Sequence, residues 1–214
     1  MSSIVEQHRR FLPHYQEQER LFSVSWRREG SLAKPVLQMI EQMRTLSDRL
    51  AEAKEDDQRQ KLALEYRNKL EDYDHQLGVY HDNGIQLTEN QVAEIIGSSF
   101  RFYDGKDYIL VAYCIMPNHI HLLIKPLLDE EGEFHHLSEI VRKLKSFTAR
   151  QILKLYPGEK KLWRADYFDR FIRGESDYWH TVEYILNNPV KALLVKRWED
   201  WPWSFQNAWY WEKK

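Results

Sequence analysis

The stretch YILVAYCIMPNHIHLLIK, residues 108–125, decides the fold of this chain. An apolar run over residues 108–116 is broken by Pro117-Asn118, and a second apolar run follows over residues 119–125. Continuous apolar runs of this length are typical of strands that are buried on both faces. The stretch therefore predicts two strands of a buried sheet.

Further strands and helices flank these two strands in mixed order. Residues 20–27 (RLFSVSWR) alternate as a strand does, and residues 166–173 are also strand-like. Apolar residues at helical spacing predict helices over 88–102, 137–155 and 176–188. The predicted N-caps are Thr88 (with Gln91 completing a capping box), Ser138 and Ser176, and Pro189 ends the last helix. This order predicts an α+β fold with a small, mainly antiparallel sheet.

Residues 33–80 carry two more helical patterns. Apolar residues recur at helical spacing on either side of the charged segment KEDDQRQ, residues 54–60, so the segment is either a helical hairpin or one long helix. Its strongly charged surface predicts an insertion beside the core and not a part of the active centre. Packing within the chain explains the apolar spacing better than a coiled coil does, although a protein partner for residues 33–80 stays an alternative.

The composition predicts one globular domain over residues 1–214, with a Trp-rich tail at about 193–214. No apolar run approaches the ~20 residues that cross a bilayer. The single cysteine, Cys114, excludes a disulfide framework and a multi-cysteine zinc site. The polar start lacks the apolar centre of a secretory signal, so we expect a cytoplasmic protein.

Charge is unevenly distributed along the chain. The formal net charge is −2, which does not favour a protein that is basic over its whole surface. Residues 141–173, however, hold ten basic and three acidic residues, a net of +7, whereas residues 41–82 hold seven basic and eleven acidic residues, a net of −4. A basic segment indicates where a polyanion would bind, and a solvated helix face explains it equally well.

His119 and His121 form the first candidate site. Residues i and i+2 of a strand project from the same face, so the two imidazoles lie side by side. Such a pair is half of a divalent metal site. The pattern alone is weak, because two histidines packed or solvated on a sheet face give the same spacing.

Tyr184 and Asn188 form the second candidate site. They are four residues apart and share one face of the predicted helix. A tyrosine hydroxyl and an amide oxygen could therefore meet the same metal-bound phosphate. The alternative is ordinary: a packed tyrosine, and an asparagine that precedes a helix-ending proline.

Three blocks together resemble a known family. Residues 113–123 (YCIMPNHIHLL) resemble the HUH block of single-tyrosine transposases, where U is a bulky apolar residue. Residues 162–173 (LWRADYFDRFIR) and 184–192 (YILNNPVKA) resemble the next segment and the nucleophile helix of the REP-associated branch. The matching region runs from about residue 109 to residue 205, with a weaker match at 20–27. The resemblance implies a ferredoxin-like antiparallel sheet with packed helices, the HUH endonuclease fold, plus the helical insertion.

The resemblance also implies a mechanism. His119 and His121 would bind Mg²⁺ or Mn²⁺, with Asn188 as the third ligand. Tyr184 would attack a phosphodiester of single-stranded DNA and leave a 5′-phosphotyrosine and a free 3′-OH. The substrate of this branch is an imperfect palindrome that folds into a hairpin, and the resemblance implies a bacterial protein associated with the nucleoid. The acting form would be a monomer or a homodimer.

Basic side chains would neutralise the DNA phosphates and make binding salt-dependent. The expected DNA-binding residues are Arg142, Lys145, Arg150, Lys160, Lys161, Arg164 and Arg173. Trp163 lies inside a family block, and we expect it to be structural and not a platform for stacked bases.

Two other functions fit the same residues. A domesticated relative could hold hairpin DNA or RNA without cutting it, and Tyr184→Phe would then leave its function intact. Alternatively, the histidine pair could hold a hydrolytic metal that activates water, but the sequence has no HExxH motif or comparable ligand array.

Overall fold

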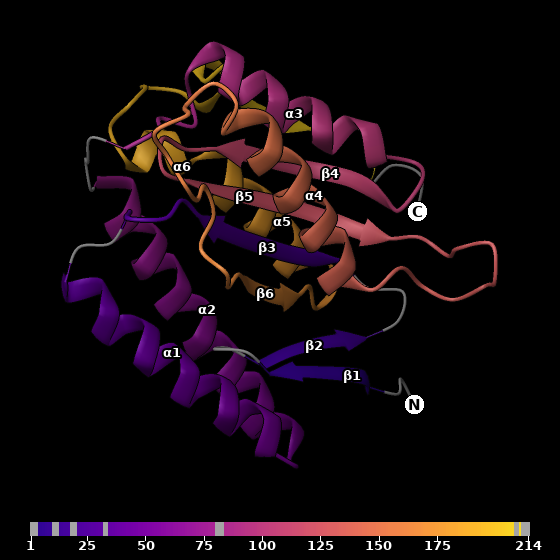
Figure 1. Cartoon of the computed structure of the whole chain (residues 1–214). Helices are drawn as coiled ribbons and strands as arrows, with labels where there is room; N and C mark the ends of the chain where they lie inside the picture. Colours follow the sequence, from indigo (N-terminus) through magenta and orange to yellow (C-terminus); the bar gives the residue numbers. More distant parts are fainter. Residues whose placement is uncertain are drawn as a thin grey trace.

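The computed structural model describes residues 4–9, 13–17, 21–31, 34–79, 84–207 and 210. At its centre lies a five-stranded antiparallel sheet with the strand order β6-β3-β5-β4-β7 (Figure 1). These strands are β3 (Phe22–Arg27), β4 (Tyr108–Ile115), β5 (His119–Pro126), β6 (Phe168–Phe171) and β7 (Ser204–Gln206). A separate hairpin is formed by β1 (Ile4–Arg9) and β2 (Pro13–Glu17).

The main helices are α3 (Asn90–Tyr103), α4 (Leu137–Ile152) and α5 (Gly174–Leu186), followed by the short α6 (Asn188–Lys191). The chain order β3-α3-β4-β5-α4-β6, with β6 beside β3, is the ferredoxin-like arrangement. The predicted α+β fold with an antiparallel sheet is therefore confirmed.

The central hairpin follows the sequence pattern closely. β4 and β5 are antiparallel, and Ile115 pairs with Ile120 across the Pro117-Asn118 turn. Strand β3 pairs with β5 on one side and with β6 on the other, so the strands predicted at 20–27 and 166–173 are both present. β6 is shorter than its pattern suggested.

The two faces of the sheet have different partners. On one face, Val24, Trp26 and Leu122 belong to a core with α3 and α4. On the other face, Leu123 and Cys114 pack against α5. Side chains alternate along a strand, so His119 and His121 share the α5 face with Leu123. The sheet thereby places both histidines on the α5 side.

All three predicted N-caps are wrong: the helices begin after other residues, and none of the three starts has a side-chain cap hydrogen bond within the described part of the chain. Helix α3 begins after Glu89, one residue later than a Thr88 cap would place it. His136 precedes α4, and Ser138 lies within that helix. Helix α5 begins at Gly174 with a positive φ of 81°, and the Asp177 carboxylate, not Ser176, accepts the Arg173 N–H.

The C-terminal end of α5 also differs from expectation. Pro189 lies at the start of the separate helix α6 and does not simply end α5. Proline is tolerated there because a first-turn N–H has no partner within its helix.

The described part of the predicted insertion, residues 34–79, folds as a helical hairpin, α1 (Lys34–Glu52) and α2 (Asp56–Val79), and not as one long helix. The hairpin has its own small core, which includes Met43, Leu70 and Tyr73, and Phe168 of β6 joins it. The rings of Tyr73 and Phe168 are 4.9 Å apart. The insertion is thus packed onto the sheet and is continuous with it.

The described part of the Trp-rich tail is structural. It contains a short 3₁₀ helix, η1 (Trp198–Asp200), and strand β7, which extends the sheet beside β4. The indole N–H of Trp201 donates to the Ile115 carbonyl at 3.0 Å. Of the helices in the described ranges, none has the length and apolar character that a membrane span requires.

Candidate active site

The two histidines lie buried side by side on the α5 face of β5. Their exposed fractions are 1% and 2%, and their ring centroids are 4.8 Å apart. Across the sheet, Arg27 pairs with His119 and Ser25 pairs with His121. The predicted histidine pair is therefore real in the structure, and it is not solvated.

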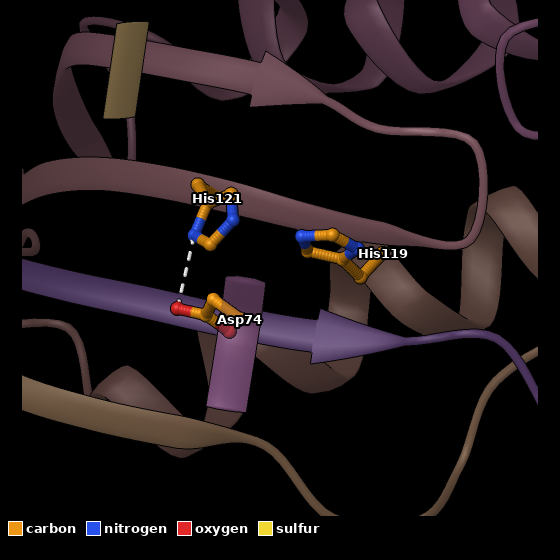
Figure 2. Close-up of side chains that lie close together, drawn as sticks. All are labelled: Asp74, His119 and His121. Atoms are coloured by element: carbon orange, nitrogen blue, oxygen red, sulfur yellow. Dashed lines mark ion pairs between the residues drawn. The ribbon is translucent and has the colours of Figure 1, made fainter. Parts of the chain in front are cut away.

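A third ligand-type side chain, Asp74, completes the cluster from helix α2. One ligand atom each from Asp74, His119 and His121 lies within 4.8 Å of the others. Figure 2 shows the three side chains converging, with the Asp74 Oδ2 at 3.7 Å from the His121 Nδ1. The insertion was expected to stay outside the active centre, and this expectation is wrong: α2 supplies one corner of the cluster.

Three polar atoms of the cluster lie buried without a partner among the described residues, as expected of metal ligands. Within the described structure, Oδ1 of Asp74 and Nε2 of both histidines are buried without a hydrogen-bond partner. Buried polar atoms in native proteins are almost always satisfied. Two imidazoles and a carboxylate are suitable ligands for a divalent ion. The residues present therefore fit a metal.

Asn118 fixes the orientation of His119. Its Oδ1 lies 2.7 Å from His119 Nδ1, and its Nδ2 donates to the carbonyl of Leu77 on α2 at 2.9 Å. An amide oxygen accepts, so His119 must donate from Nδ1 and keep a lone pair on Nε2. The residue that reads as a turn former in the sequence therefore joins the ligand strand to the insertion.

Electrostatics keep the imidazoles neutral. Burial lowers the pKa of His121 to about 3 and takes the pKa of His119 well below its ordinary value. Neutral imidazole is the form that binds metals. Burial raises the pKa of Asp74 to about 8, against an opposing hydrogen bond from Tyr184. In the absence of a cation, the Asp74 carboxyl is therefore mostly protonated at neutral pH.

Tyr184 of α5 joins the cluster directly. Its hydroxyl donates to Asp74 Oδ2 at 2.8 Å, and its ring lies 5.8 Å from the ring of His121. The ammonium of Lys191 sits 4.5 Å from the centre of the tyrosine ring. Burial and the neighbouring Asp74 raise the pKa of Tyr184 well above its ordinary value, so the group is a phenol.

Asn188 lies one turn after Tyr184, as the spacing predicts. It is buried, and its Nδ2 donates to the Tyr184 carbonyl at 2.8 Å. This contact stabilises the end of α5. Its role as a metal ligand stays a prediction.

The sequence contains a signal that could have revealed Asp74. The apolar stripe of α2 runs through Leu70, Tyr73 and Leu77, and Asp74 is four residues after Leu70. A carboxylate on the buried face of an amphipathic helix requires a partner. That partner is distant in sequence, so the pattern alone does not identify it.

Five of the seven predicted DNA-binding residues line one groove of about 700 Å³ between α4 and residues 160–167. They are Arg142, Lys145, Lys160, Lys161 and Arg164. Two of them, Lys161 and Arg164, contact Glu29 at 2.6 and 2.8 Å. Trp163 is buried and donates to Thr148, which agrees with a structural role.

The other two predicted residues lie elsewhere. Arg150 of α4 does not line the groove, and Arg173 stacks on the Phe171 ring at 4.3 Å beside α2. The groove therefore supports part of the predicted surface, and the DNA contacts themselves stay a prediction.

Comparison with known proteins places these residues in context. Residues 84–188 match the family described as "Transposase IS200 like". A REP-associated tyrosine transposase of Escherichia coli is 31% identical over 122 residues, which cover 56% of this chain and 67% of that protein. A candidate member of the same group from Haemophilus influenzae is 32% identical over 103 residues, 44% of this chain and 56% of that protein.

A solved structure of a REP-associated tyrosine transposase bound to a REP hairpin aligns at 17% identity and a TM-score of 0.48, covering 94% of this chain and 82% of that one. The segment that matches the family model contains His119, His121, Tyr184 and Asn188, and it excludes Asp74.

Proposed function

Because the chain belongs to the REP-associated tyrosine transposases, of the IS200-like transposase family, we propose that it is a metal-dependent enzyme that nicks and rejoins single-stranded hairpin DNA. The observation that carries this proposal is the contact between the nucleophile and the ligand cluster. The Tyr184 hydroxyl donates at 2.8 Å to a carboxylate that itself lies beside His121. A tyrosine with only a packing role does not require a hydrogen bond to a carboxyl group that lies beside the histidine pair.

His119, His121 and Asp74 would hold one divalent ion, Mg²⁺ or Mn²⁺, with Asn188 as a further candidate ligand. When bound, the ion would polarise the scissile phosphate and hold it in place. The protein fixes the ligands in advance: Asn118 sets the tautomer of His119, and burial keeps both imidazoles neutral.

Tyr184 would act as the nucleophile. Its phenolic oxygen forms a bond to the phosphorus, and the bond between that phosphorus and the 3′ oxygen breaks. The products are a 5′-phosphotyrosine and a strand with a free 3′-OH. Oδ2 of ionised Asp74 is in place to accept the phenolic proton, and the leaving 3′ oxygen takes up a proton. Attack by the 3′-OH of another strand end reverses these steps and rejoins DNA.

The DNA would lie along the groove beside α4, where cationic side chains neutralise its phosphates. The REP-associated relatives make a palindromic hairpin with single-stranded flanks the first substrate to test. Such a substrate places the enzyme at the chromosome in the bacterial cytoplasm.

Covalent trapping tests the proposal. Labelled hairpin oligonucleotides with single-stranded flanks are incubated with protein in Mn²⁺ or in chelator and then separated on a denaturing gel. We expect a shifted band that requires Mn²⁺ and disappears in Tyr184→Phe. The matched control, Tyr178→Phe, changes a tyrosine of the same helix and should keep the band. Binding without any band in the wild type would instead indicate a non-cleaving hairpin-binding protein.

A further inference from the structure

A small cavity of about 80 Å³ is lined by His119 and Asp74, and Tyr184 lines a separate pocket. Its walls come from β3, α2 and the segment before β6. Besides His119 and Asp74, the polar groups on these walls include Ser25, Arg27, Tyr73, Arg164 and the carboxylate of Asp166. The ligand cluster needs none of these groups, so the cavity requires a separate explanation.

Arg27 is the unusual member of this cavity. It is only 7% exposed, and no carboxylate of the described residues lies within ion-pair distance of its guanidinium. Nearby Glu29 pairs with Lys161 and Arg164 instead. Burial lowers the pKa of Arg27, and the nearby Tyr73 hydroxyl, which is itself buried without a hydrogen-bond partner among the described residues, opposes this effect. A buried cation without a counter-ion costs stability, so it is more easily explained as a receptor for an anion that arrives with the substrate.

Arg27 is also in the correct place to act on the substrate. It pairs with His119 across β3 and β5, so the two side chains project from the same face of the sheet. Paired residues of antiparallel strands lie about 5 Å apart. An anion held by Arg27 would therefore be a close neighbour of a phosphate held at His119.

The cavity shares part of its lining with the basic groove. Arg164, Asp166 and Tyr167 line both of them. A strand that follows the groove toward the ligand cluster would therefore pass Arg27 immediately before it reaches His119. The small volume and the forked guanidinium fit a phosphate better than a base.

We propose that Arg27 binds the backbone phosphate adjacent to the scissile phosphate, on the side of the strand that leads into the basic groove. The inference rests on the proposed function, because it assumes that single-stranded DNA reaches the His119 cluster. Arg27 is then a positioning residue: it sets the register of the strand, and Tyr184 meets one defined phosphodiester.

A charge-deletion scan of the DNA tests this inference. Each oligonucleotide carries one methylphosphonate, which removes the charge of a single phosphate near the cleavage position. Binding is measured in the Tyr184→Phe background, with and without Mn²⁺, so that no cleavage occurs. For unvaried Arg27, we expect one position outside the scissile phosphate where affinity falls about tenfold or more, as for a charge-assisted contact.

Variants of Arg27 locate the origin of that loss. Arg27→Gln should bind unmodified DNA about tenfold more weakly and should show no additional loss when the methylphosphonate is at that position. The slope of log affinity against log salt should fall in magnitude by about 0.7, because one contact to a single-strand phosphate is lost. Arg27→Lys should recover part of the affinity. Arg101→Gln, the charge control, removes a cation of helix α3 that contacts Tyr113 and lines neither the cavity nor the groove, and it should bind like the unvaried protein.

Stability provides an independent readout. Arg27→Gln removes a buried unpaired charge, so its melting temperature should be equal to or above that of the unvaried protein. If Arg27→Gln binds every oligonucleotide as the unvaried protein does, or loses affinity equally at every position, the inference is wrong. The scan of the unvaried protein can also overturn the inference without any Arg27 variant. It does so if no methylphosphonate position lowers the DNA affinity, or if affinity falls when a base is removed and not when a phosphate charge is removed. If the protein binds no hairpin DNA at all, the proposed function itself fails.

Discussion

At the residue scale, Asp74 connects Tyr184, the proposed nucleophile, with the histidine pair. Oδ2 accepts the Tyr184 hydroxyl, and Oδ1 is buried without a partner in the part of the chain that the structure describes. The carboxyl lies in a helix outside the region that matches the family model. Asp74 and Asn188 are therefore rival third ligands, and their chemistry differs, because only the carboxyl titrates.

Metal affinity should depend on pH through Asp74. Without metal, the Asp74 pKa is raised to about 8, so below pH 8 a bound cation must displace a proton. The histidine pKa values are lowered far below this range and add no dependence. We expect Mn²⁺ affinity to rise up to about tenfold per pH unit from pH 6 to 8 and then to level off.

Titration calorimetry in buffers of different ionisation enthalpy measures the affinity and the proton release together. Asp74→Asn should flatten the pH dependence and Asn188→Ala should preserve it. A pH-independent affinity in the wild type would favour Asn188 over Asp74 as the third ligand.

Asn118 should matter for metal affinity without touching the metal. It accepts from His119 Nδ1 and donates to the Leu77 carbonyl, so Asn118→Ala frees both the ring and the end of α2. Loss of such supporting hydrogen bonds typically costs about 10- to 100-fold in metal affinity. The same calorimetry checks this, with exposed Asn90→Ala of α3 as control. Equal affinities would show that the hydrogen bond does not position His119.

At the element scale, helix α2 is the structural support of Asp74. Glu71 of α2 lies 2.7 Å from His180 of α5, and Arg67 lies 3.3 Å from Asp177. Partly exposed ion pairs contribute little on their own, so the apolar contacts of α2 must hold most of its position.

Truncating a buried leucine of α2 should therefore affect both the fold and the site. Leu77 is 1% exposed, and Leu77→Ala should lower the free energy of unfolding by about 2–5 kcal/mol. It should also weaken Mn²⁺ binding, because it loosens the helix that presents Asp74. Leu64 of the same helix is 48% exposed, and Leu64→Ala should change stability by less than about 0.5 kcal/mol. Thermal unfolding and calorimetry distinguish the two variants, and similar behaviour of both would contradict the packing described.

Local patterns predicted the elements but not the contact between the insertion and the sheet. The apolar runs around Pro117-Asn118 were sufficient for the β4–β5 hairpin, and i, i+2 spacing was sufficient to pair His119 with His121. The Asp74–Tyr184 contact joins residues that are 110 positions apart, and periodicity carries no information about such contacts. The helix caps were missed because each helix begins after a residue other than the predicted one, and at α5 the Asp177 carboxylate, not Ser176, accepts the Arg173 N–H.

At the scale of the whole molecule, charge is separated although the net charge is only −2. Arg164 lines both the α4 groove and the cavity at His119, so the proposed DNA surface adjoins the histidine pair. The groove is a feature of tertiary structure: it combines α4 with residues 160–167, and Arg150 and Arg173 of the same basic segment lie outside its lining.

Salt dependence should distinguish the groove from the rest of the basic segment. Lys160→Gln and Arg142→Gln should each weaken hairpin binding and reduce the slope of log affinity against log salt by about 0.7–0.9. Arg150→Gln should leave the slope unchanged, because Arg150 does not line the groove. Fluorescence anisotropy at several salt concentrations provides these slopes. Equal effects of all three variants would mean that DNA does not follow the groove.

The most direct test of the central claim is to find the tyrosine that carries DNA after the reaction. Mn²⁺-dependent adducts are digested with nuclease and trypsin, and the peptide covering residues 174–191, which contains both Tyr178 and Tyr184, is fragmented in a mass spectrometer. We predict a nucleotide on Tyr184 alone. A nucleotide on Tyr178 or on another residue, or hydrolysed DNA with no adduct at all, would contradict the assignment of Tyr184 as the nucleophile.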